Sequence, residues 1–92
     1  MKLGVVTQQP TERQSYTVDY SEALTDGDNI ESAFATSSPE GLVVEHVSPI
    51  DPRVRFWVSG GTSGVSYKVT VTANTADGRT FQDELTFKIK EV

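Results

Sequence analysis

Three glycines within five residues form the first segment whose residue types suggest chemistry. The stretch Gly60-Gly-Thr-Ser-Gly64 has the small residues of a phosphate-binding loop. A P-loop also needs a lysine and a Ser or Thr after its last glycine, at the start of a helix whose N–H groups face the phosphate. Here Val65 follows, and the next residues alternate between apolar and polar as a strand does. The segment therefore favours a turn between strands, because glycine supplies the positive φ angles of tight connections.

Two other segments have residue types found at metal or catalytic sites. Asp26-Gly-Asp-Asn-Ile-Glu31 clusters carboxylates, which calcium prefers, but it lacks the ligand spacing of an EF-hand and equally suits a polar turn. His46 is the only histidine and there is no cysteine, which argues against zinc sites and excludes disulfides. We expect His46 on a strand surface or partly buried, not as a catalytic base. The sequence thus predicts a non-enzymatic protein without metal or cofactor.

The row Arg53-x-Arg55-x-Trp57 is the strongest candidate for a binding surface. Alternate residues of a strand face opposite sides, so Phe56 is expected in the core and the row on the other face. Trp and Arg are enriched at binding hot spots. Trp57 could equally be covered by the chain's own N-terminal arm, or pack as a second core anchor. A short apolar patch near the N-terminus has the same ambiguity, and the candidate interface residues are Leu3, Val5, Val6, Arg53, Arg55 and Trp57.

Short strands must position these residues. Residues 1–14 predict an extended N-terminal arm that is mobile unless something captures it, and residues 15–92 predict a single domain. Runs of alternating residues separated by turn residues recur through that domain. They predict strands at 15–20, 29–36, 42–47, 53–58, 65–74 and 80–90, with one helical turn at 21–24 and an Asp-Gly hairpin turn before the last strand.

This spacing of strands indicates an all-β fold, a small antiparallel immunoglobulin-like β sandwich, with a small barrel as the alternative. The usual Cys pair of antibody domains is absent. Pro49 and Pro52 are expected to interrupt pairing, because proline cannot donate to a ladder, and Asp83 alone breaks the alternation of the last strand. The predicted core faces include Tyr16, Val18, Tyr20, Leu24, Ile30, Phe34, Val54, Phe56 and Val58.

Composition and charge limit the function classes. The 92 residues carry a net charge of −5 with a pI near 4.6, which argues against nucleic-acid binding, since phosphates require a basic face. No apolar run approaches the ~20 residues of a membrane span, and the N-terminus lacks a signal-peptide core, so we expect synthesis in a cytosol and no membrane partner. Five acids at 19–31 without a base predict one acidic edge.

Four segments together resemble a known family. They are residues 20–32 (YSEALTDGDNIES), 39–42 (PEGL), 58–70 (VSGGTSGVSYKVT) and 75–80 (TADGRT). In order and spacing they are similar to the immunoglobulin-like fibre-tail adaptor proteins of tailed bacteriophages, over about residues 15–90. Family members often have aromatic residues where this chain has Ala23 and Ala33 or Phe34. The resemblance implies a structural protein of the virion near the neck, tail or fibre, with neither cofactor nor catalysis.

Two functional hypotheses follow. The first is a non-enzymatic adaptor of a phage virion, made in the host cytoplasm, that links neck, tail or fibre proteins through sheet edges, the arm and the Trp57 row. A homo-oligomer within the particle is one arrangement that this hypothesis allows. It predicts that deleting residues 1–14 leaves a folded domain but impairs incorporation into particles. The second is a host-surface or glycan-binding module, which would require accessible Trp57 and tyrosines to stack on sugars.

Overall fold

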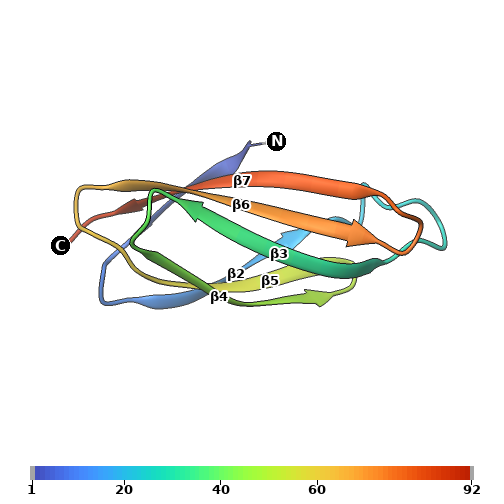
Figure 1. Cartoon of the computed structure of the whole chain (residues 1–92), viewed down its shortest axis with the longest axis horizontal. Helices are drawn as coiled ribbons and strands as arrows, with labels where there is room; N and C mark the ends of the chain where they lie inside the picture. The colour runs from blue at the N-terminus through green and yellow to red at the C-terminus, as the bar shows by residue number, and fades with distance from the viewer. Residues whose placement is uncertain (1, 92) are drawn as a thin grey trace.

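Seven strands in two packed sheets make up the fold, and a computed structural model describes residues 2–91 (Figure 1). The strands are β1 (Lys2–Gln8), β2 (Arg13–Asp19), β3 (Ile30–Ser38), β4 (Leu42–Ile50), β5 (Arg53–Gly60), β6 (Ser66–Thr75) and β7 (Thr80–Ile89). No helix occurs among the described residues, and hence none that could cross a membrane. The predicted all-β sandwich is confirmed.

The sheet topology is close to that of an immunoglobulin constant domain. One sheet has the order β1-β7-β6-β3 and the other the order β2-β5-β4. Lettered A to G, these are A-G-F-C and B-E-D, so the first strand pairs in the C-F-G sheet, whereas constant domains have it in the other sheet. All pairs are antiparallel except β1 with β7, which are parallel.

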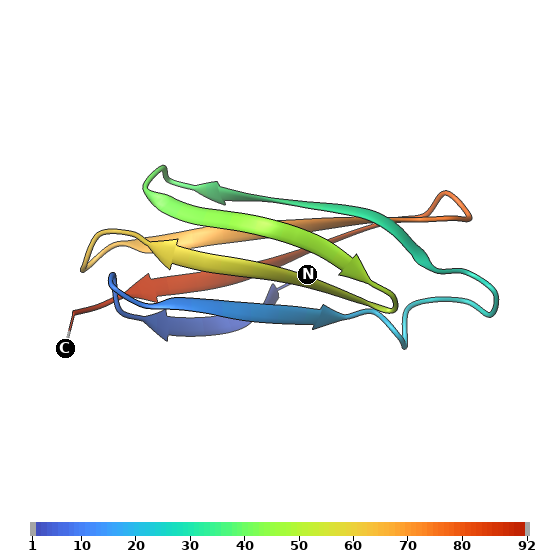
Figure 2. The same ribbon diagram turned by 90° about the horizontal axis from the view of Figure 1, so that it is seen from below.

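The strands run along the long axis of a body of 45 × 21 × 19 Å, with connections gathered at its two ends (Figures 1 and 2). The core between the sheets contains the predicted inward row of β5, whose three side chains are completely buried. The alternating residues of β6 and two residues of β7 face them. The fully buried large side chains are Val54, Phe56, Val58, Tyr67, Val69, Val71, Phe87 and Ile89.

The first residues of the chain are held by the sandwich, whereas the sequence predicted an extended arm that is mobile unless something captures it. They are extended, but β1 pairs with β7 from Lys2↔Glu84 to Gln8↔Ile89. Gln8, only 2% exposed, fixes the end of this strand. Its side chain donates to the carbonyl oxygens of Val58 and Glu12, both at 3.0 Å, and accepts from the Tyr16 hydroxyl. These bonds satisfy the hydrogen-bonding groups of a buried amide. Together with the ladder to β7 they make the segment part of the sandwich.

A bulge in β3 reverses part of the predicted core face. Ile30 is buried as expected, but the register shifts between Ile30 and Ser32. One extra residue sends all later side chains of a strand to the other face. Ala33 then packs against the core, while Phe34 lies outside and is 53% exposed. The prediction that Phe34 faces the core was wrong for this reason.

Three smaller predictions concern single residues. Pro49 does not end its strand, because β4 is a sheet edge where a missing N–H is tolerated. Leu24 closes a turn to the Tyr20 carbonyl and packs against the core, without forming a helix. Asp83 breaks the alternation of β7 because it is a buried acid on the core face. Burial, and then the nearby Asp83 carboxyl group, raise the pKa of the Tyr20 hydroxyl well above its usual value.

Candidate functional site

The outer surface of the β2-β5-β4 sheet carries the Arg-x-Arg-x-Trp row. Trp57 is flanked across the strands by Ser15 and Glu45, and Arg55 by Thr17 and Ser48. Because three of these neighbours are short, the row stands above the sheet surface. We name as the Trp57 face the outward residues Arg13, Val43, Glu45, Ile50, Arg53, Arg55 and Trp57.

Two guanidinium groups lie over the Trp57 ring. The Arg13 Cζ atom is 4.3 Å and the Arg55 Cζ atom 4.9 Å from the ring centroid. Trp57 is half-buried under them, and each such contact contributes about 0.5–1 kcal/mol at an exposed site. Trp57 is therefore not a core anchor. It is covered in part by the chain itself, because the two guanidinium groups stack over its ring.

The arginines of the Trp57 face differ in how their charge is compensated. Arg13 Nε is 3.4 Å from a Glu45 carboxylate oxygen, and Arg53 Nε is 3.6 Å from one of Asp19. Arg55 has no carboxylate within 4.0 Å among the described residues. Its charge is the uncompensated one of this face, and the stacking on Trp57 leaves its N–H groups available to an acceptor.

The other predicted interface residues do not join this face. Val5 pairs with Thr86 on the outer surface of the opposite sheet and is 61% exposed, whereas Val6 points inward and packs against the core. The side chain of Leu3 lies outside the part of the chain whose side chains are described. The structure thus places Val5 on the opposite outer surface of the sandwich from the Trp57 face.

Four residues of the Trp57 face are absent from the sequence prediction, namely Arg13, Val43, Glu45 and Ile50. Val43 lies in a segment predicted to be a strand covered on one side and partly covered on the other, and Ile50 lies in the segment that prolines were expected to interrupt. Their side chains are 46% and 51% exposed. Arg13 was assigned to the arm. Alternation extended back from Ser15 places Arg13 on the face of that residue, and this signal was present in the sequence. The bulge at His46 and Val47, which restores Ile50 to the outer face, has no comparable signal.

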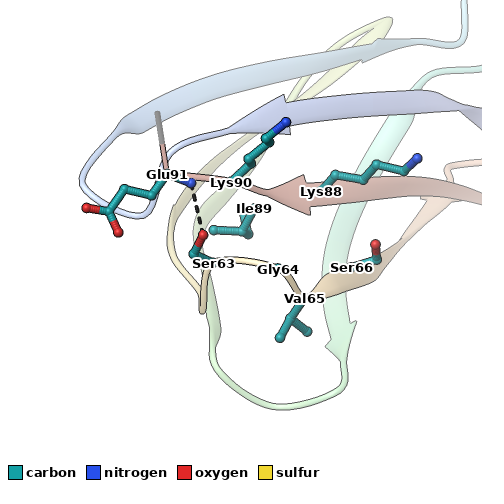
Figure 3. A pocket seen from close by; sticks show the side chains of 8 residues that line it. All are labelled: Ser63, Gly64, Val65, Ser66, Lys88, Ile89, Lys90 and Glu91. Carbon is teal, nitrogen blue, oxygen red and sulfur yellow. Dashed lines mark hydrogen bonds between the residues drawn. The ribbon is translucent and has the colours of Figure 1, made fainter.

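The glycine segment forms a connection at one end of the sandwich and borders a shallow open pocket of about 490 Å³ (Figure 3). Three of its N–H groups, and that of Val65, donate to acceptors within the protein. Gly61 donates to the Gly41 carbonyl, Thr62 to the Tyr67 hydroxyl, Gly64 to the Ile89 carbonyl and Val65 to the Thr62 carbonyl, at 2.8–3.1 Å. Ser63 accepts from the Glu91 N–H at 3.0 Å. These donors are occupied and do not form a cradle for a phosphate.

The acidic stretch at residues 26–31 has a structural use. Burial opposes ionisation of Asp28, but N–H groups of Asp77 and Asn29, the Thr75 hydroxyl and the Arg79 guanidinium hold the pKa of the carboxyl below its usual value. The Arg79–Asp28 distance is 3.0 Å. Asp28 therefore ties the β2–β3 loop to the β6–β7 turn. Within residues 2–91 no three His, Cys, Asp or Glu side chains are placed to hold a metal ion.

Acid should weaken this tie. Since the folded-state pKa of Asp28 is lowered, its stabilisation is complete above the pKa of the unfolded chain, about 4, and is lost as pH falls through the lower folded value. We expect Asp28→Asn to be less stable than wild type at pH 7, with the difference shrinking below about pH 4. Urea midpoints measured from pH 7 to pH 2 check this. Asp26→Asn, an exposed residue of the same loop, should follow the wild-type profile, and a constant deficit of Asp28→Asn at all pH values would contradict the linkage.

The fold and these surfaces define a class of protein, a small immunoglobulin-like sandwich. Its loops are joined by hydrogen bonds, and one sheet face carries arginine and tryptophan side chains. A family model described as podophage GP4 fiber-tail adaptor protein gp77 matches residues 8–88. The chain belongs to this family, which is one of phage structural adaptors. A search of curated proteins found no match.

Proposed function

We propose that the protein is a non-enzymatic component of a phage virion that joins tail and fibre or neck proteins, and that the Trp57 face is one of its contact surfaces. It is made in the host cytoplasm and its partners are proteins, with no nucleic acid, membrane or cofactor involved. The observation that carries the proposal is the stacking of Arg13 and Arg55 on Trp57. Tryptophan and arginine dominate binding hot spots, and side chains held in place before binding lose less entropy.

Two further observations support contact through a sheet face. The Trp57 face ends in the exposed Val43 and Ile50, which supply apolar area beside the charged centre. The β4 edge contains Pro49 and a bulge where His46 has a φ of 51°. Such features hinder the addition of a strand. The face of this sheet is therefore better suited to docking than its β4 edge.

The glycan-binding alternative gains no support from the aromatic residues. Tyr20 and Tyr67 are buried, and Tyr16 packs on Phe87 with ring centroids 5.0 Å apart. Trp57 is the remaining aromatic of the hypothesis, and guanidinium groups occupy its ring. A sugar-stacking platform needs an open aromatic surface, which these four side chains do not provide.

Loss of Trp57 should impair assembly and leave folding intact. Trp57→Ser removes the stacking platform, and a central hot spot costs at least about 2 kcal/mol, or about 30-fold in affinity. We expect the variant to be depleted from particles when it replaces the wild-type protein, as measured by quantitative blotting of purified particles. Phe34→Ser, an exposed aromatic on the other sheet, is the matched control and should be incorporated normally. Normal incorporation of Trp57→Ser would remove this face from the function.

A further inference from the structure

The net charge of the protein is concentrated at one end of its long axis. The loops and strand ends there carry seven acidic residues and two arginines, and the sum of their charges is −5, the net charge of the whole chain. The remaining six acids and six bases cancel. The seven acids are Asp19, Glu22, Asp26, Asp28, Glu31, Asp51 and Asp77, and the two arginines are Arg53 and Arg79. This end of the molecule attracts a cationic surface.

The segment 21–27, named here the acidic loop, presents this charge outward. It projects beyond the ends of the strands in both views (Figures 1 and 2). Backbone hydrogen bonds from Leu24 to Tyr20 and from Asp28 to Thr25 give it a fixed shape. Glu22 and Asp26 are exposed in it. Neither has a cationic partner within 4.0 Å in residues 2–91, unlike Asp19 and Asp28.

The Trp57 face carries an uncompensated positive charge, which is complementary to the acidic loop. Its Arg55 lacks a carboxylate partner within the described chain, and its guanidinium stacks on the Trp57 ring. A planar guanidinium binds a carboxylate through two parallel N–H groups, so its natural acceptor is an Asp or Glu side chain. The acidic loop of the same copy points away along the long axis and does not return over this face.

We infer that the Trp57 face binds the acidic loop of a second copy of this chain, with Arg55 pairing with Glu22 or Asp26. The inference rests on the proposed use of the Trp57 face and names its partner. Two copies that exchange loops reciprocally form a closed dimer, whereas one-way docking forms a ring or a chain. In either arrangement each copy contributes one loop and one face.

Sedimentation velocity of the full chain tests this association. Wild type should associate at about 20 mM salt and less at about 500 mM, because exposed charges are screened. Arg55→Glu should weaken association at least tenfold, as should Glu22→Lys combined with Asp26→Lys. A mixture of these two variants should associate again, because the negative face now meets a positive loop. Lys88→Glu, an exposed residue of the other sheet, is the matched charge reversal and should associate as wild type does.

Three results would overturn the inference: a wild-type protein that stays monomeric at low salt, association that Arg55→Glu leaves unchanged, or a mixture that does not associate. Circular dichroism melts confirm that each variant is folded, and Arg55→Gln removes the charge without reversing it. Particle incorporation separates this inference from the proposed function. If Trp57→Ser is excluded from particles while the mixture fails to associate, the face binds a different protein and only the self-association is refuted.

Discussion

Gly61→Ala is expected to destabilise the sandwich by about 3 kcal/mol, as the sum of a backbone cost of about 1 kcal/mol and overpacking of about 2 kcal/mol. Gly61 has a φ of +92°, which L-residues with a Cβ atom rarely adopt. A Cβ there would lie 2.7 Å from Ile89 Cγ1 and 3.2 Å from Tyr67 Cε2, both in the buried core. Urea unfolding followed by Trp57 fluorescence measures the change.

Gly64→Ala separates the two contributions. Gly64 has nearly the same φ, +90°, but no atom lies within 4 Å of the position that its Cβ would take. We expect it to lose only the backbone cost of about 1 kcal/mol. Equal losses in the two variants would show that the Gly61 segment moves away from the core at no cost, and would contradict the close packing described here.

Gln8→Leu is expected to cost about 2–4 kcal/mol, although it keeps the side-chain volume and adds apolar surface. It leaves the Val58 carbonyl oxygen and the Tyr16 hydroxyl without the amide that now bonds both, and the link between β1 and β5 is lost. Gln9→Leu is the neighbouring control, because no hydrogen bond of the Gln9 side chain occurs in the described structure. Thermal and urea unfolding measure both variants.

A double-mutant cycle identifies the source of this loss. If Tyr16 depends on Gln8, then Tyr16→Phe should cost less in the Gln8→Leu background than in wild type, by about 1 kcal/mol. Additive losses would mean that the two side chains are not coupled. The same bonds revise the deletion experiment expected from sequence. Removal of residues 1–14 takes away β1, Gln8 and Arg13, so it should unfold the domain and cannot report on assembly alone.

Sequence reasoning located the strands that carry a long period-2 pattern. The last two were expected at 65–74 and 80–90 and are observed at Ser66–Thr75 and Thr80–Ile89. Their pattern is clear because each has one face in the core and one in solvent. The inward row of β5 was also predicted, because Val54, Phe56 and Val58 are apolar residues in strict alternation.

The failures came from information that no local pattern contains. The bulge before Ser32 shifts the register by one residue and exposes Phe34, and a count of alternating residues cannot detect a single insertion. The pairing of β1 depends on β7, which lies more than seventy residues along the chain. Gln8 looked like part of a polar arm, because its burial follows from partners on β5 and β2. For the site, the Arg53-x-Arg55-x-Trp57 row was found on the predicted face, but the second guanidinium over Trp57 depends on the same tertiary arrangement.

The parallel pairing of β1 with β7 has a mechanical consequence. The chain enters this pair at Lys2 beside the middle of β7 and leaves it after Ile89, beside the end of β1 (Figure 1). A force that pulls the two termini apart along the long axis would slide the strands past each other, so all the hydrogen bonds of the ladder would bear the load together. An antiparallel hairpin pulled from its open end instead opens one bond at a time. The first and last strands thus form a shear joint between the two ends of the chain.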